Sequence, residues 1–194
     1  MAARFHVKSN IIFQFLGDIC VMKIALILMV SIFSCFSVST MGQVLRPKAT
    51  QDLIWHTDLM KAHEISTASK KPIFAFFTGS DWCGWCHKLQ RDVFAKQEFI
   101  NWAQKNVVLL ELDFPRGKTL SPELTKQNAN LQQQFAVQGY PSIWLFLTSN
   151  NPKENKFNIT PLGSLGYPTG AEKGREEVKF LGDANAILAT KKPQ

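Results

Sequence analysis

The apolar and polar positions of this chain fall into blocks that predict strands and helices in turn. Continuous apolar runs of four to eight residues are typical of strands buried on both faces, and helices repeat their apolar positions every three or four residues. Strands are expected at residues 53–55, 73–78, 107–113, 142–148 and 157–165, the last broken by Pro161. Helices are expected at residues 60–70, 83–94, 96–105, 121–137 and 176–189.

With adjacent helices merged, the order of elements is β α β α β α β β α. Leu89, Val93 and Phe94 share one face of their helix, and Ser121 followed by Pro122 has the pattern of a helix N-terminus. Strands alternating with helices favour a layered α/β domain. We therefore predict a central mixed sheet flanked by helices on both faces.

The first 42 residues follow another pattern. Met22-Lys23 precedes the apolar run 24–33, which has the length of a signal-peptide core and is short for a membrane span. We expect translation to start at Met22 and cleavage near Gly42, which leaves residues 43–194 as the domain. Two alternatives stay open, a retained membrane anchor and a lipid carried by Cys35. All three place the domain outside the cytoplasm, in the periplasm or an equivalent compartment.

Composition and charge narrow the classes of function. The chain has 194 residues, of which 45% are hydrophobic, enough for the core of one domain. The formal net charge of +7 comes from scattered rather than clustered basic residues. A scattered basic excess keeps a protein soluble, and we expect no nucleic-acid partner.

The stretch Asp81-Trp82-Cys83-Gly84-Trp85-Cys86-His87-Lys88 carries the candidate chemistry. It lies between a predicted strand and a predicted helix, so the first sulfur lies at a helix N-terminus, where free N–H groups stabilise a thiolate. A Cys pair at this spacing near a βαβ pattern indicates a redox site. A purely structural disulfide is a poor alternative, because a bridge that spans two intervening residues restrains only a short piece of the chain. A zinc site needs more ligands, and Cys20 and Cys35 lie in the leader.

This motif, the order of elements and Gly139-Tyr140-Pro141 before a later strand together resemble the thioredoxin family over roughly residues 50–190. The closest resemblance is to exported members with an aromatic-rich approach to the Cys pair. The resemblance implies that Cys83 attacks the substrate and that Cys86 resolves the mixed disulfide. Four residues would form the substrate-binding surface: Trp82, Trp85, Tyr140 and Pro141.

The resemblance also implies a cis peptide bond at Pro141, against the alternative of a trans proline that begins an edge strand. Two departures from the family pattern matter. Trp85 occupies the position where the familiar reductase has proline, so the reduction potential does not carry over. Phe76 or Phe77 occupies the place of the family's buried acid. Glu111 on the next strand is a possible substitute, although a solvated Glu is the more ordinary interpretation.

We expect an exported thiol–disulfide oxidoreductase, with reductase favoured over isomerase and oxidase. Its redox-active pair Cys83/Cys86 is the only cofactor expected, with no metal. The expected partners are exported proteins that contain disulfides and a membrane electron donor, and the expected state is a monomer. His87 is expected to be exposed. The alternative is a thioredoxin-fold copper chaperone or a non-catalytic binding module, which would need further His or Met ligands.

Overall fold

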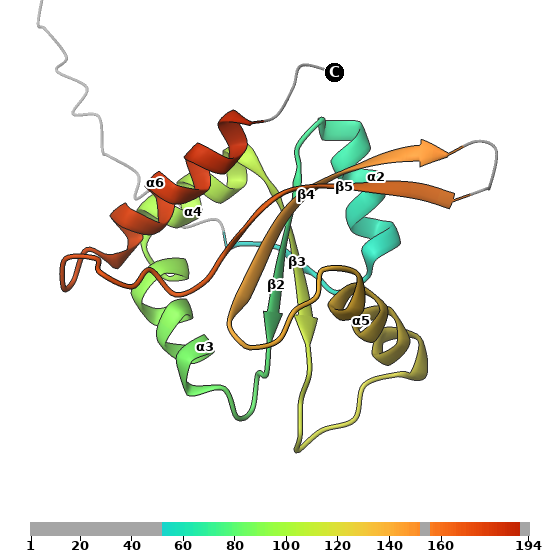
Figure 1. The fold of residues 1–194 in the computed structure, drawn as a ribbon, viewed down its shortest axis with the longest axis horizontal. Helices are drawn as coiled ribbons and strands as arrows, with labels where there is room; N and C mark the ends of the chain where they lie inside the picture. Colours follow the sequence, from blue (N-terminus) through green and yellow to red (C-terminus); the bar gives the residue numbers. More distant parts are fainter. Residues whose placement is uncertain (1–51, 152–155, 191–194) are drawn as a thin grey trace, which may run out of the picture. The chain divides into compact units, whose positions relative to one another are not determined.

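Five strands form one mixed sheet in the order β1-β3-β2-β4-β5 (Figure 1). The structure is a computed structural model, and it describes residues 52–151 and 156–190. Their strands are β1 (Trp55–His56), β2 (Ile73–Thr78), β3 (Val108–Asp113), β4 (Ser142–Asn151) and β5 (Lys156–Leu165). Strands β1, β3 and β2 are parallel, whereas β4 runs antiparallel to β2 and β5 antiparallel to β4.

Helices cover both faces of this sheet, as predicted. Their bounds are α2 (Leu59–Ser69), α3 (Gly84–Leu89), α4 (Gln97–Asn106), α5 (Pro122–Gln134) and α6 (Glu176–Ala189). In Figure 1, α3, α4 and α6 lie on one side of the sheet and α2 and α5 on the other. The N-terminus of α5 follows the sequence pattern, since the Ser121 side chain accepts a hydrogen bond from the Leu124 N–H.

The central strand β2 is buried along its whole length because both faces of the sheet are covered. Its alternate side chains enter two cores. Phe74 and Phe76 join an aromatic-rich core under α3, α4 and α6 that also contains Cys83 and Cys86. The other set, including Phe77, packs under α2 and α5. The Cys pair is therefore anchored directly in the first core.

Several bounds differ from the sequence-based expectations, including the ends of β4 and α5, and three differences have a plain physical description. The first strand is Trp55–His56 rather than residues 53–55, because only these two residues pair with β3. Pro161 does not break β5, since it lies at a register irregularity in the β4–β5 pairing, where a missing N–H is tolerated. The helix after the motif changes at Gln90–Phe94 into a π-helical turn, which is named η1 below.

The expectations about the leader fall on residues outside the described ranges. These are the start at Met22, the apolar run 24–33, the lipid on Cys35 and cleavage near Gly42. Within residues 52–151 and 156–190, each helix is too short or too polar to cross a bilayer.

Candidate active site

The direction of the strands brings four loops to one edge of the sheet. β2, β3 and β5 run the same way, so their carboxyl ends meet at this edge, and antiparallel β4 begins there. The Cys motif follows β2, and Arg116 follows β3. Tyr140 precedes β4, and Tyr167 follows β5. Residues far apart in the sequence therefore lie beside the Cys pair.

Cys83 and Cys86 form a disulfide, with their Cα atoms 5.2 Å apart. Cys83 caps helix α3, and the Cys86 N–H donates a hydrogen bond of 3.1 Å to the Cys83 Sγ. Cys83 is 5% exposed, whereas Cys86 is fully buried. The sulfur that faces a helix N-terminus and stays within reach of a partner is thus that of Cys83.

The first side of the site, called the Trp82 side below, consists of Gly79, Trp82, Phe114, Arg116 and Tyr140. The indole N–H of Trp82 donates to the Phe114 carbonyl over 2.8 Å, and its ring lies against Gly79. A Cβ on Gly79 would come within 2.4 Å of that ring, so glycine is required here. The Arg116 guanidinium lies over the Trp82 ring, 3.8 Å from the ring centroid.

Tyr140 joins the Trp82 side to the start of β4. Its ring contacts that of Trp82 edge-on at 5.8 Å and stacks on Phe114 at 5.2 Å. Gln132 donates to the Tyr140 hydroxyl over 2.8 Å. Burial raises the pKa of this hydroxyl, so it stays neutral. The Tyr140–Pro141 peptide bond is cis, which confirms that expectation.

The second side, called the Trp85 side below, consists of Trp85, Lys88, Asp92 and Tyr167. Trp85 is 58% exposed and meets the Tyr167 ring edge-on at 5.1 Å. Lys88 Nζ forms an ion pair with Asp92 and donates to the Tyr167 hydroxyl over 2.5 Å. That hydroxyl donates to Asp92 over 2.9 Å, which closes a three-membered cluster.

The ionisation of the Trp85 side is set by these same contacts. The hydrogen bond from Lys88 holds the pKa of Asp92 below its usual value, and the same bond raises the pKa of Lys88. Desolvation raises the pKa of the Tyr167 hydroxyl. At neutral pH the cluster therefore holds one cation, one carboxylate and one neutral phenol.

Two acids fix the loops beneath the Trp82 side. Asp81 accepts the backbone N–H groups of Arg116 and Gly117, which lower its pKa together with the charge of Lys118. Burial alone would raise the pKa of Asp113, but hydrogen bonds from Ser80 and Lys118 hold it below its usual value. Both carboxylates therefore anchor these loops through hydrogen bonds to other residues of the chain.

Glu111 lies on the face of the sheet that carries the Cys pair. It pairs with Phe76, whose side chain belongs to the same core as Cys83 and Cys86. Burial raises the pKa of Glu111, and the nearby charge of Asp113 adds to this effect. The interpretation of Glu111 as an ordinary solvated residue therefore does not fit its half-buried position.

The structure brings the sequence-predicted residues Cys83, Cys86, Trp82 and Tyr140 together, with Pro141 next to Tyr140 and Trp85 on the opposite side. His87 is exposed, as expected, and its Nε2 is 2.8 Å from the Ser80 carbonyl oxygen. Sequence reasoning missed the contributions of Arg116 and Tyr167. Their position in the sequence could have indicated them, because each residue follows the end of a strand that runs parallel to β2.

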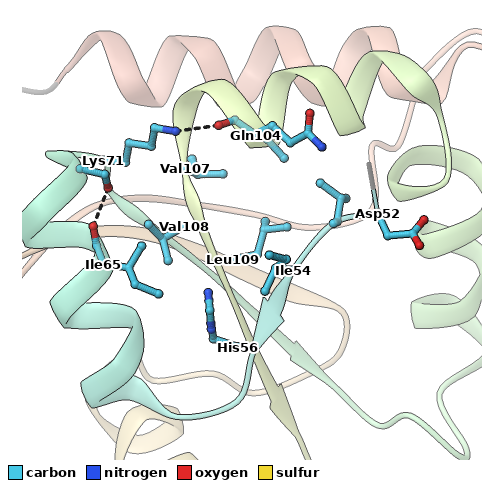
Figure 2. Close-up of a pocket in the computed structure, with 12 residues that line it drawn as sticks. Asp52, Ile54, His56, Ile65, Lys71, Gln104, Val107, Val108 and Leu109 are labelled. Atoms are coloured by element: carbon cyan, nitrogen blue, oxygen red, sulfur yellow. Dashed lines mark hydrogen bonds between the residues drawn. The ribbon is translucent and has the colours of Figure 1, made fainter. Parts of the chain in front are cut away.

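A pocket of about 330 Å³ lies away from this edge. It opens between α2, α4 and the start of β3 and is lined by Ile54, His56 and Val107 among others, with Lys71 donating to the Gln104 carbonyl at its rim (Figure 2). It holds no sulfur and no acid cluster. In the described ranges 52–151 and 156–190, no three His, Cys, Asp or Glu residues gather as a metal site.

Comparisons with known proteins agree with this geometry. Residues 59–151 match the model of a thioredoxin-like domain. The chain is 34% identical over 125 residues to the disulfide bond reductase DsbH of Chlamydia pneumoniae. This aligned region covers 64% of this chain and 74% of that protein. It is 29% identical over 125 residues to the thioredoxin-related protein DsbJ of the same organism, covering 34% of that protein.

A solved structure of a DsbH oxidoreductase superposes on this fold. The TM-score is 0.60 and the identity 28%, over 77% of this chain and 94% of the other.

Proposed function

This chain belongs to the thioredoxin-like family and is a thiol–disulfide oxidoreductase, and we propose that it acts as a reductase on the disulfides of exported proteins. The observation that carries this proposal is the closed Cys83–Cys86 disulfide at the N-terminus of α3. The direction is supported by the 34% identity to a protein named a disulfide bond reductase.

The proposed reaction uses the two sulfurs in turn. The Cys83 thiolate attacks one sulfur of the substrate disulfide, forms a mixed disulfide and releases the other substrate sulfur as a thiolate, which takes up a proton. Cys86 then loses its proton and attacks Cys83 Sγ, which breaks the mixed disulfide and releases the second substrate sulfur as a thiolate that takes up a proton in turn. The substrate gains two electrons and two protons, and the enzyme is left with the disulfide seen here. The burial of Cys86 supports its role as the internal, resolving thiol.

We propose that Glu111 accepts the proton that Cys86 loses. Its raised pKa and its place on the Cys face of β3 support this role, and Asp113 is already engaged by Ser80 and Lys118. Glu111→Gln should slow resolution most between the raised pKa of Glu111 and the ordinary pKa of a thiol, about 8.5, because there Glu111 is ionised while the Cys86 thiol still carries its proton. Stopped-flow measurement of mixed-disulfide decay against pH tests this, and an unchanged pH profile would remove Glu111 from the mechanism.

The substrate-binding residues remain Trp82, Trp85, Tyr140 and Pro141, and the Cys pair itself is the only cofactor that the proposal needs. We further propose that the protein works as a monomer outside the cytoplasm and is recharged by a membrane electron donor. Cell fractionation and the accessibility of Cys83 to a membrane-impermeant thiol reagent test this location.

The reduction potential of the Cys83/Cys86 pair decides the direction. Equilibration of the full chain with glutathione buffers should give a value near roughly −270 mV, which is typical of a reductant. A value near roughly −120 mV marks an oxidant and would overturn the reductase proposal.

Substitution of each cysteine tests the proposed roles of Cys83 as attacking thiol and Cys86 as resolving thiol. Cys83→Ser should abolish turnover, because no attacking thiolate remains. Cys86→Ser should accumulate mixed disulfides that survive non-reducing electrophoresis. Normal turnover by the Cys86→Ser protein would contradict the two-cysteine mechanism.

A further inference from the structure

One cation beside the Cys pair has no acidic partner. Six ion pairs join described residues, and the Arg116 guanidinium takes part in none of them. Only the backbone N–H of Arg116 reaches the Asp81 carboxylate. Because a guanidinium is always charged, Arg116 presents a positive, forked donor to solvent.

The contacts of Arg116 hold this charge over the residue that precedes the reactive cysteine. Its guanidinium lies 3.8 Å from the ring centroid of Trp82, the residue directly before Cys83. Trp82 is in turn held by the Phe114 carbonyl, and the Asp81 carboxylate holds the Arg116 backbone. The side chain therefore needs little further ordering to bind a partner, and ordering is a main cost of exposed contacts.

The other charged groups that hold the two tryptophan sides are engaged within the protein. Lys88 is bound to Asp92 and Tyr167 on the Trp85 side, and Lys118 is bound to Asp113. Asp81 is bound to two backbone N–H groups. Among the described charged side chains of the Trp82 and Trp85 sides, Arg116 is thus the one whose hydrogen-bonding capacity remains for a substrate.

We propose that Arg116 is a specificity-determining residue, which recognises a carboxylate next to the reactive cysteine of the substrate and so favours acidic over neutral segments. This inference rests on the proposed function for its substrate, an extended segment that contains a disulfide. Planar bidentate pairing with a carboxylate is the interaction that a guanidinium forms best.

Binding without chemistry provides the first test. The oxidised full-length protein is titrated with two nine-residue peptides whose central cysteine is replaced by serine, with either Glu or Gln on both sides of it. We expect the Glu peptide to bind about fivefold more tightly at low ionic strength and the ratio to fall in high salt. Arg116→Gln should bring the ratio to about one, and Arg116→Lys should keep part of it because the charge remains without the fork.

Lys105→Gln is the matched control, because it also removes one exposed positive charge. Lys105 precedes the start of β3, whereas Arg116 follows its end. This control should keep the wild-type ratio. A ratio near one in the wild type, a ratio unchanged in Arg116→Gln, or an equal loss in Lys105→Gln would each overturn the proposal.

A second arm separates this inference from the proposed function. The reduced protein is mixed with the homodisulfides of the same two peptides carrying central cysteine, and the rate of reduction is measured. A fivefold preference for the Glu form that Arg116→Gln removes supports the role of Arg116. If neither homodisulfide is reduced, the reductase proposal fails, and the binding ratio still decides the role of Arg116.

Discussion

Trp82 and Trp85 flank the same cysteine, yet the protein holds them by different means. Trp82 is fixed by a backbone carbonyl, by a glycine beneath its ring and by Tyr140, so neutral groups set most of its position. Trp85 is more exposed and meets the ring of Tyr167, which a Lys88–Asp92 ion pair holds in place. The Trp82 side is therefore a fixed surface, and the shape of the Trp85 side depends on ionisation.

The difference assigns separate tasks to the two sides within the proposed mechanism. A fixed indole beside Cys83 gives an incoming disulfide a constant surface, and Arg116 adds charge to it. The exposed indole of Trp85 adapts to the remainder of the substrate at little cost in stability. The following predictions test this comparison, beginning with the largest expected effect.

Removal of each indole gives the most direct test. Trp82→Ala should lower the free energy of unfolding by about 2 kcal/mol, because it removes packing and a hydrogen bond. Trp85→Ala should change it by no more than about 0.5 kcal/mol, as is usual for exposed side chains. Urea unfolding of the oxidised proteins measures both, and equal losses would contradict the comparison.

A methyl group under the Trp82 ring tests the same contact from below. Gly79→Ala should cost about 1.5 kcal/mol, because the new Cβ would come within 2.4 Å of the indole and must displace it. In a Trp82→Ala background the same change should cost almost nothing, which a double-mutant cycle will show.

Gly84→Ala is the matched control for this pair. Gly84 follows Cys83 directly, and a Cβ placed there meets no atom within 4 Å. Its unfolding free energy should stay within about 0.5 kcal/mol of wild type. A loss as large as that of Gly79→Ala would show that any side chain next to the motif is harmful, whatever its contact with Trp82.

These contacts show which parts of the molecule could be predicted from its sequence. β2 was predicted with its observed bounds because five consecutive apolar residues, Ile73 to Phe77, fit a strand in a sheet that is covered on both faces. β1 was expected at residues 53–55 but lies at Trp55–His56, since it pairs with β3 through these two positions and its pattern is correspondingly short. The π-helical turn at Gln90–Phe94 was missed because the apolar spacing around it is also that of an α-helix.

The residues of the site likewise divide into those that the sequence predicts and those that it does not. Cys83, Cys86, Trp82 and Trp85 are neighbours in the sequence, so one motif predicts them together. Arg116 and Tyr167 lie 33 and 84 positions after Cys83, and only the order and direction of β3 and β5 bring them to the same edge. Their partners depend on side-chain contacts between loops, which apolar periodicity does not encode.

The smallest expected effect is a pH dependence confined to the Trp85 side. The pKa of Asp92 in the folded protein lies below its ordinary value of 3.8, mainly through the hydrogen bond from Lys88. The stabilisation from Asp92 is therefore complete above about pH 4 to 5 and is lost as the pH falls through the folded pKa. The pKa values of Lys88 and Tyr167 are raised in the folded protein. The stabilisation that these two groups give is therefore lost at alkaline pH, as they deprotonate.

The acid limb can be followed at the two indole N–H groups by NMR, assigned with Trp82→Phe and Trp85→Phe. The Trp85 signal should shift as the pH falls below about 4, because protonation of Asp92 releases Tyr167. Asp92→Asn should abolish that shift and leave the Trp82 signal with whatever dependence Asp81 and Asp113 give it. If Asp92→Asn alters both signals alike, the two sides are coupled, and the comparison between a fixed and an ionisation-dependent surface is wrong.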